Sequence, residues 1–211
     1  PVAPAIARAE AAMLEWLGWH CPRVLERHDV ESLRRLRAEV VAAHPGRLHD
    51  LSFLRHAAIE RAVTGCGYPA ECADGAFAAF FEARNRVELF ADVLPALDRL
   101  AARYRLLALS NGNADLGVIG IAERFEHAVS AREAGAAKPD PRIFAVLLER
   151  AAIDADEVVY VGDDPHADVE GARAAGLRAV WMDRGARGWP AAVAPPEHRV
   201  RDLGELAALL G

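Results

Sequence analysis

Hydrophobic positions in the first part of the chain follow the period of an α-helix. Ile6, Ala9, Met13 and Leu17 lie three or four residues apart and would line one face of a helix. Three further stretches have similar spacing: residues 33–41, 53–59 and 77–84. Breaks rich in proline and glycine separate these stretches. Because nothing here alternates as a β-strand does, residues 5–88 are predicted to form a small helical bundle.

From about residue 89 the pattern changes to short apolar runs that alternate with helical stretches. The predicted strands are residues 105–110, 128–130, 158–161 and 179–182. The predicted helices are residues 93–103, 114–122, 141–152, 167–175 and 203–210. Strands that are apolar at nearly every position are typical of a parallel sheet with helices on both faces. Residues 89–211 are therefore predicted to form a Rossmann-like α/β core, in which ligands bind at the carboxyl ends of the strands.

Three aspartates follow the predicted strand 158–161, namely Asp163, Asp164 and Asp168. Carboxylates that crowd at a strand end repel one another unless a cation lies among them. Mg²⁺ suits such a position, because it binds a few carboxylate oxygens together with water and phosphate. The plainer alternative is an aspartate that caps the helix 167–175 while the other two are solvated. The pattern favours a Mg²⁺ site that acts on a phosphorylated small molecule.

Two other polar motifs lie after predicted strands or in loops beyond them. Ser110-Asn111-Gly112-Asn113 offers a hydroxyl, an amide and an accessible backbone N–H, which suit the oxygens of a phosphoryl group. A tight turn is the alternative, since Asn-Gly is common in turns. Lys138 begins a Lys-Pro-Asp-Pro motif, whose prolines restrict the backbone around the lysine. A lysine held there would balance carboxylates and a phosphate, and the alternative is a solvated lysine in a turn.

Charge and composition argue against several classes of protein. The 211 residues are 53% hydrophobic and have a net charge of −6, with both signs mixed along the chain. No basic stripe indicates a nucleic-acid partner, and no run of about 18 apolar residues indicates a membrane span. The cysteines are expected to be free thiols in a reducing cytoplasm. The cysteines Cys21, Cys66 and Cys72 lack the spacing of zinc ligands, and so do the three histidines His44, His49 and His56.

Taken together, the three polar motifs resemble those of the haloacid dehalogenase (HAD) superfamily of aspartyl-nucleophile hydrolases. Ser110-Asn111-Gly112 matches the second motif of that family, and Lys138 matches the third. Gly162-Asp163 with Asp168 matches the fourth. The matches span about residues 90–185. The resemblance implies a HAD-like core over residues 89–211 and a helical cap over residues 5–88, inserted after the first strand.

The first motif of the family, a strand that ends in Asp-x-Asp, has no counterpart in the sequence. Asp29 and Asp50 are the only aspartates before Asp74, and neither follows an apolar strand. Residues 1–10 resemble the segment that follows this motif in the family. We therefore expect a strand with Asp-x-Asp upstream of Pro1, because without it two neighbouring strands would have unpaired edges.

The resemblance also implies a role for each motif. An upstream aspartate would attack the phosphoryl group and form an aspartyl-phosphate, which water then hydrolyses. Asp163 would bind Mg²⁺, and Asp168 would bind the metal directly or support it from outside. Lys138 and Ser110 are the expected catalytic residues, because the lysine would offset negative charge at the phosphoryl group. The expected phosphate-binding residues are Ser110, Asn111, Gly112 and Lys138.

The acidic fourth motif favours a phosphatase, because the dehalogenases of the superfamily need no metal and resemble Ser-Ser-Asn-x-x-Asp at this place. Residues 47–55, residues 110–114 and Gly162-Asp163-Asp164 resemble bacterial phosphatases of the riboflavin pathway, which act on FMN and on 5-amino-6-(5-phosphoribitylamino)uracil. A small phosphorylated metabolite is therefore the expected substrate, and Mg²⁺ the expected cofactor. The alternatives are a broad-range nucleotide or sugar phosphatase, a haloacid dehalogenase and, if the chain is complete, a non-catalytic protein that binds phosphorylated ligands.

Overall fold

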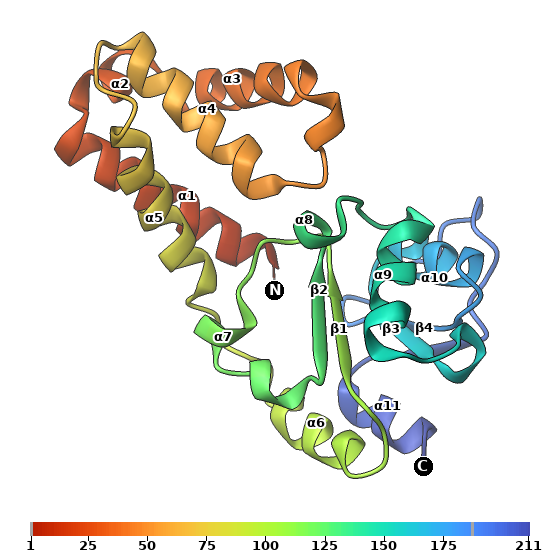
Figure 1. Cartoon of the computed structure of the whole chain (residues 1–211). Helices are drawn as coiled ribbons and strands as arrows, with labels where there is room; N and C mark the ends of the chain where they lie inside the picture. The colour runs from red at the N-terminus through yellow and green to blue at the C-terminus, as the bar shows by residue number, and fades with distance from the viewer. Residues whose placement is uncertain (1, 187) are drawn as a thin grey trace. The chain divides into compact units, whose positions relative to one another are not determined.

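The chain forms two compact units, which Figure 1 shows with their helices and strands. The computed structural model describes residues 2–186 and 188–211, with side chains from Pro4 onward. Unit 1 comprises the residues up to Glu88 together with Gly112–Gly120, and unit 2 comprises Leu89–Asn111 and Ile121–Gly211. Residues 112–120 follow the first strand of unit 2 in the chain but pack with unit 1.

Unit 1 is built from helices. Its long helices are α1 (Val2–His20), α3 (Val30–Ala43), α4 (Leu51–Gly65) and α5 (Cys72–Asn85). Its short helical segments are α2 (Pro22–Arg27), a 3₁₀ turn at Pro45–Arg47, and α7 (Leu116–Ile119). All four helical stretches predicted from the hydrophobic spacing lie in the long helices. The hydrophobic pattern does not predict the short α2, because this helix begins at Pro22, and proline breaks a helix in its interior but is favoured at its first position.

The core of unit 1 forms where α1 packs against α5. The predicted apolar face of α1, with Ala9, Met13 and Leu17, is buried there. Gly75 of α5 lies so close to Trp16 that an added Cβ would be 2.2 Å from a ring carbon. The other buried residues of this cluster are Cys21, Val24, Ile59, Ala62, Val63, Cys66, Ala73, Ala76 and Phe80. Small residues on α5 therefore allow the two helices to approach closely.

Unit 2 has parallel strands in two sheets. The strands are β1 (Leu107–Ser110), β2 (His127–Ser130), β3 (Val159–Gly162), β4 (Arg178–Met182) and β5 (His198–Val200). β1 pairs with β2, and β4 lies between β3 and β5 in the second sheet. The helices are α6 (Val93–Ala101), α8 (Ala131–Ala134), α9 (Pro141–Ala151), α10 (Gly171–Ala174) and α11 (Leu203–Leu209). The predicted parallel α/β fold is confirmed.

Alternate residues of a strand are buried on opposite faces of the sheet. In β4, Ala179 and Trp181 pack in a cluster that includes residues of α9 and α10. Val180 and Met182 pack in another cluster, with residues of α6 and α11. Helices thus cover both faces, which is why the predicted strands are apolar at nearly every position.

Several elements of unit 2 and its neighbouring segment differ from the sequence prediction, and the four-residue helix α8 was not predicted. β5 was not predicted, because its residues His-Arg-Val contain a single apolar side chain. The helix expected over 167–175 begins earlier, as a π-helical segment at Pro165–Glu170 that α10 continues. The helix expected over 114–122 is α7 followed by a 3₁₀ turn at Ala122–Arg124. Gly120, with a φ of 84° in the left-handed region, ends α7.

β1 and β3 are edge strands, each with one partner strand among the described residues. β4 has a strand on both sides and is buried over its last four residues. β1 and β3 are half-buried over most of their length. An edge strand leaves backbone N–H and C=O groups without a ladder partner, so these two edges are open to pairing.

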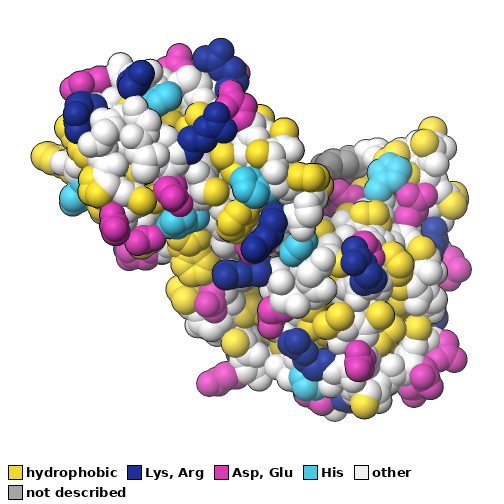
Figure 2. Space-filling view, turned by 45° about the horizontal axis from the view of Figure 1, so that its top comes forward, with side chains coloured by type: hydrophobic (Ala, Val, Ile, Leu, Met, Phe, Trp, Pro, Cys, Tyr) yellow, Lys and Arg dark blue, Asp and Glu magenta, His cyan; other side chains and the backbone are white. Residues whose placement is uncertain are grey.

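The helices and the surface charges can be compared with the composition of the chain. In the described part of the chain, no helix is long and apolar enough to cross a membrane. The longest helix, α1, has 19 residues and includes Arg8, Glu10 and Glu15. On the face that Figure 2 draws, basic and acidic side chains are interspersed. Basic and acidic residues are mixed in the same way along the sequence.

Candidate active site

Asn111 fixes the backbone of Lys138. Its side-chain nitrogen donates a hydrogen bond to the Lys138 carbonyl oxygen at 2.9 Å, and its side-chain oxygen accepts one from the Lys138 N–H at 2.7 Å. Asn111 directly follows β1, whereas Lys138 lies in the loop before α9 and begins a cis peptide bond to Pro139. Two of the predicted motifs, 27 residues apart in sequence, therefore form one local structure.

The Lys138 ammonium group contacts both sheets of unit 2. Nζ donates to Asp168 Oδ1 at 2.7 Å and to the Tyr160 hydroxyl at 2.8 Å, and more weakly to the Leu109 carbonyl oxygen at 3.5 Å. Leu109 belongs to β1 and Tyr160 to β3, so the same positive charge contacts residues of both edge strands. The Lys138 side chain is 10% exposed. A buried charge of this kind is stable only when it is paired, as it is here by Asp168.

Lys138 is also the only lysine in the sequence, since 24 of the 25 basic residues are arginines. Arginine presents a wide planar fork of donors, whereas lysine presents a compact ammonium group with three donors. The Lys138 donors are directed at three acceptors in a confined space. The single lysine thus occurs at a place where a guanidinium group would fit poorly.

Asp168 is buried, and both of its carboxylate oxygens accept hydrogen bonds. Oδ1 accepts from Lys138 and from the Tyr160 hydroxyl at 3.0 Å, while Oδ2 accepts from the Asp164 N–H at 2.9 Å. Gly162 makes room for this carboxylate, because a Cβ at Gly162 would lie 2.3 Å from Asp168 Cγ. A larger residue than glycine would therefore collide with Asp168 at this position of the Gly-Asp motif. The carboxylate of Asp168 is placed to orient Lys138.

Tyr160 belongs to this cluster although the sequence analysis does not single it out. Its hydroxyl accepts from Lys138 and donates to Asp168. Burial, reinforced by the carboxylates of Asp168 and Asp163, raises the pKa of Tyr160, so the hydroxyl remains a donor at neutral pH. The sequence contains one indication of this role: Tyr160 is a hydroxyl-bearing residue within the otherwise aliphatic residues of strand β3.

Asp163 and Asp164 have different surroundings. The Asp164 side chain accepts from the N–H groups of His166 and Ala167, at 2.9 and 2.8 Å. Helix capping, the alternative weighed for this acidic loop, thus applies to Asp164. Asp163 is exposed, its carbonyl oxygen accepts from Trp181 Nε1 at 3.2 Å, and its charge contributes to the raised pKa of Tyr160. Its carboxylate is therefore near the Lys138 cluster but open to solvent.

The remaining predicted site residues lie at or after the end of β1. Ser110 is exposed at the last position of this strand, in register with Ser130 of β2. Gly112 packs with unit 1. The structure thus joins Asn111, Lys138 and Asp168 by hydrogen bonds. Ser110 lies at the carboxyl end of β1, beside the carboxyl end of the parallel strand β2.

The donor set at the end of β3 suits a hard divalent cation. Asp163 offers an exposed carboxylate, and Asp168 lies five residues further on, held by three donors. Mg²⁺ commonly takes one or two protein carboxylates and fills its other positions with water and phosphate oxygens. Among the described residues no three acidic, histidine or cysteine side chains converge to hold a metal by themselves. Asp163 is the more exposed of the two carboxylates, and Asp168 fits a supporting position.

The fold and this cluster define a parallel α/β enzyme whose charged site lies at the carboxyl ends of its strands. The family model of the haloacid dehalogenase-like hydrolases matches residues 2–176. The chain belongs to this family of hydrolases, as the three polar motifs indicated.

Relatives of known activity include both phosphatases and dehalogenases. The chain is 33% identical to the 5-amino-6-(5-phospho-D-ribitylamino)uracil phosphatase YigB of Escherichia coli, over 85% of this chain and 76% of that protein. It is 40% identical to a phosphoserine phosphatase of Thermus thermophilus, over 61% of this chain and 53% of that protein. A solved structure of a 2-haloacid dehalogenase from Pseudomonas syringae superposes with a TM-score of 0.93 at 36% identity, over 99% of this chain and 92% of that one.

Proposed function

We propose that the protein is a Mg²⁺-dependent phosphatase that hydrolyses a small phosphorylated metabolite through an aspartyl-phosphate. The observation that carries this proposal is the Lys138 cluster. A single ammonium group is fixed by Asn111 and Asp168 at the strand ends, beside the exposed carboxylate of Asp163. A fixed cation next to a solvent-facing acid suits an anionic substrate that arrives with a metal ion.

Each residue of the cluster has a proposed task. Lys138 offsets the negative charge of the phosphoryl group and of the nucleophile. Asn111 and Asp168 hold Lys138 in place, and Ser110 binds a phosphoryl oxygen. Asp163 would hold Mg²⁺, which when bound reduces the repulsion between an anionic nucleophile and an anionic substrate.

We also propose that one further strand, ending in the nucleophilic Asp-x-Asp, lies between β1 and β3. Both strands have one partner strand among the described residues, and Lys138 contacts a residue of each strand. The Leu109 carbonyl oxygen, which a neighbouring strand would engage, accepts from the Lys138 ammonium group. Such a strand would join the two sheets into one and would bring an aspartate to the place where Lys138 and Asp163 lie.

The substrate we favour is FMN or another phosphorylated compound of the riboflavin pathway. This rests on the residues that resemble such phosphatases and on the 33% identity to the E. coli enzyme. In this proposal residues 5–88 form the cap that selects the substrate and residues 89–211 form the catalytic core. The identity to phosphoserine phosphatase makes a phosphorylated amino acid a second candidate.

Dehalogenation is the competing activity, because the superposed Pseudomonas syringae structure is that of a 2-haloacid dehalogenase. Displacement of a halide ion from a haloacid does not require a metal ion. The acidic pair Asp163-Asp164 favours the phosphatase, since Asp163 leaves a carboxylate exposed at the strand end.

One assay separates the two activities. The natural protein, including the proposed strand with the nucleophile, is purified and incubated with p-nitrophenyl phosphate, FMN, O-phosphoserine, a pyrimidine nucleotide and 2-chloropropionate, each with Mg²⁺ and with EDTA. We expect phosphate release that requires Mg²⁺ and is fastest for one of the metabolites. Chloride release in EDTA, without any phosphate release, would show that the protein is a dehalogenase.

A further inference from the structure

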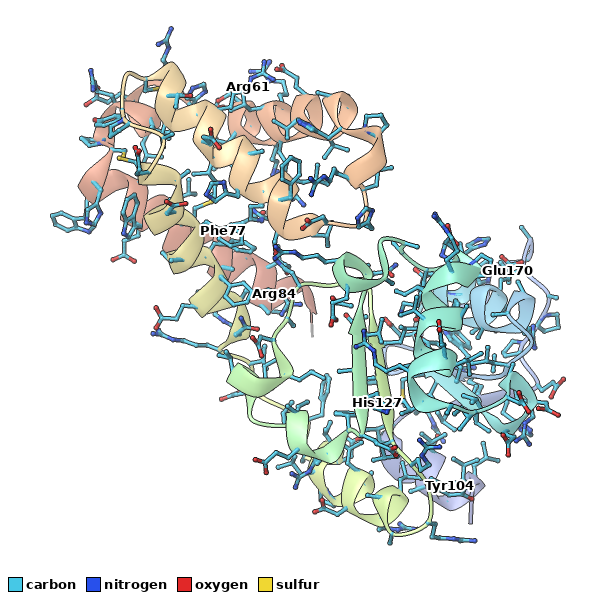
Figure 3. The ribbon with its side chains drawn as sticks, in the orientation of Figure 1. Arg61, Phe77, Arg84, Tyr104, His127 and Glu170 are labelled. Atoms are coloured by element: carbon cyan, nitrogen blue, oxygen red, sulfur yellow. The ribbon has the colours of Figure 1, made fainter. Side chains whose placement is uncertain are left out.

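Unit 1 buries two arginine side chains, and they differ in their partners. Arg55 is 7% exposed, forms an ion pair with Glu10 at 3.4 Å and lies 3.8 Å from the centroid of the Phe80 ring. Arg84 is 8% exposed and has no hydrogen bond, ion pair or ring contact with the described residues. Its Nε atom is fully buried without an acceptor. Figure 3 labels Arg84 near the end of α5.

Burial of Arg84 without a partner is unusual, because arginine is almost never fully buried unless it is paired. Its Nε atom is fully buried without an acceptor, whereas its two terminal nitrogens are not among the fully buried unpaired atoms of the described residues. Burial lowers the pKa of Arg84, and no charged neighbour acts on that pKa. The group nevertheless stays protonated at neutral pH, since arginine does not lose its proton in proteins. The acidic Glu82, two residues away, is engaged by Arg86. Arg84 therefore holds a positive charge that lacks a counter-charge in the described part of unit 1.

Asn85, the neighbour of Arg84 in the chain, holds a polar segment of unit 1 in place by hydrogen bonds. The side chain of the adjacent Asn85 is buried; its nitrogen donates to Phe81 and its oxygen accepts from the Asp115 N–H at 2.8 Å. This bond holds the segment Gly112–Gly120, which continues directly from Ser110-Asn111. In the same segment Asn113 donates to the Ser52 hydroxyl at 3.3 Å.

We propose that Arg84 is a specificity-determining residue that binds an anionic group of a ligand, either a carboxylate or a phosphate. The planar fork of a guanidinium group matches both oxyanions and binds them through two parallel hydrogen bonds. Binding supplies the missing counter-charge and the missing acceptor for Nε. If the phosphatase activity proposed above is correct, Arg84 selects phosphomonoesters with a second acidic group. This extension rests on the proposed function, and it favours the second candidate substrate, a phosphorylated amino acid, over FMN, which has no second acidic group.

The binding itself is tested by NMR on the arginine Nε–H groups. The Arg84 resonance is assigned from its loss in Arg84→Gln, and the protein is titrated with sodium phosphate and with sodium acetate against sodium chloride of equal ionic strength. We expect the Arg84 signal to shift saturably with phosphate or acetate and to stay constant with chloride. The exposed Arg61 of the same unit, whose partner is Glu39 at 2.8 Å, serves as the matched reference signal. An Arg84 signal that responds to neither oxyanion overturns the proposal.

Thermal unfolding distinguishes a ligand site from a structural ion pair. Without added oxyanion, Arg84→Met should raise the unfolding midpoint, because it replaces an unpaired buried charge by an apolar side chain of similar length. Arg55→Met should lower the midpoint, because it leaves Glu10 without its partner. If Arg84→Met lowers the midpoint as much as Arg55→Met does, then a protein group already pairs with Arg84 and the proposal is wrong.

Kinetics test the extension to substrate choice. For Arg84→Gln we expect KM for O-phosphoserine to rise at least tenfold more than KM for p-nitrophenyl phosphate, which lacks a second acidic group. Arg61→Gln should change the two values alike. An equal rise for both substrates in Arg84→Gln refutes the selective role. If the wild type hydrolyses neither compound, the proposed phosphatase function fails, while the NMR titration still decides whether Arg84 binds an oxyanion.

Discussion

Among the described residues, Lys138 provides the only basic side chain that is hydrogen-bonded to Asp168, and it is the only lysine of the chain. Its three acceptors lie at 2.7, 2.8 and 3.5 Å from Nζ. We expect Lys138→Ala and Asp163→Asn each to lower kcat by about 10²–10³-fold, as loss of one electrostatic contact to a transition state does. Lys138→Arg should restore little of the activity, because the larger planar group does not fit among these acceptors.

These variants are compared by steady-state phosphate release, with circular dichroism to verify the fold. Exposed Arg61, in unit 1, provides the control substitution Arg61→Gln. Activity of Lys138→Arg or Asp163→Asn close to the wild-type level would contradict the roles proposed for these side chains.

Tyr160 is expected to act by positioning Lys138. Tyr160→Phe removes a hydroxyl that accepts from Lys138 and donates to Asp168. A hydrogen bond to a charged group contributes about 1.5–3 kcal/mol, so we expect kcat to fall by about tenfold or more and the unfolding midpoint to decrease. Tyr104→Phe is the matched control, because the Tyr104 hydroxyl donates to the Leu210 carbonyl oxygen at an exposed place. Equal effects of the two substitutions on kcat would refute the positioning role.

At the scale of elements, the close approach of α1 and α5 depends on a glycine. A Cβ at Gly75 would lie 2.2 Å from the Trp16 ring, so Gly75→Ala must displace the indole or separate the helices. We expect a loss of about 1–3 kcal/mol in the free energy of unfolding, as for other overpacked cores. Gly65→Ala, where a Cβ would meet nothing within 4 Å, should be neutral. Urea denaturation measures both, and equal stability of the two variants would contradict this packing.

Asp92 joins three distant parts of unit 2. Its carboxylate accepts from Arg184 at 2.6 and 3.0 Å and from the Leu203 N–H at 2.8 Å. The Arg184 guanidinium, together with the Leu203 N–H, lowers the pKa of Asp92 below its ordinary value of 3.8. A lowered pKa means that this carboxylate stabilises the fold fully above pH 3.8 and progressively less as the pH falls through the folded-state pKa.

Asp92→Asn should therefore be less stable than the wild type near pH 7, and the difference should shrink as the pH falls below about 4. Denaturation curves from pH 3 to 7 measure the difference. Asp98→Asn is the control, because the Asp98–Arg124 pair has a largely exposed carboxylate and should contribute little. A stability difference for Asp92→Asn that grows at low pH would show that the pKa of Asp92 is not lowered in the folded protein.

At the scale of the whole molecule, the proposed extra strand between β1 and β3 makes a prediction about hydrogen exchange. If that strand is present in the natural protein, the amides of β1 and β3 should exchange as slowly as those of β4, which has a partner on each side. Hydrogen–deuterium exchange with mass spectrometry resolves these peptides. Fast exchange in β1 and β3, beside slow exchange in β4, would show that the two edges stay open.

Much of the architecture could be predicted from local patterns. The long helices of unit 1 and the strands β1 to β4 follow directly from hydrophobic spacing, because burial of one helix face or of both strand faces leaves that pattern in the sequence. β5, α2 and α8 were missed. Three residues with one apolar side chain, a helix that begins at a proline and a helix of four residues leave almost no hydrophobic pattern. The sequence also contained the Asn111, Lys138 and Asp168 motifs at its strand ends.

The family and the residue types of the site were determined by the sequence itself, because its motifs are short and local. Their arrangement was decided by the tertiary structure. It separated Asp164, which caps a helix, from Asp163, and it added Tyr160, whose hydroxyl lies between Lys138 and Asp168. It also distinguished the paired Arg55 from the unpaired Arg84. Hydrogen-bond partners and burial depend on residues far apart in the chain, so no local pattern contains them.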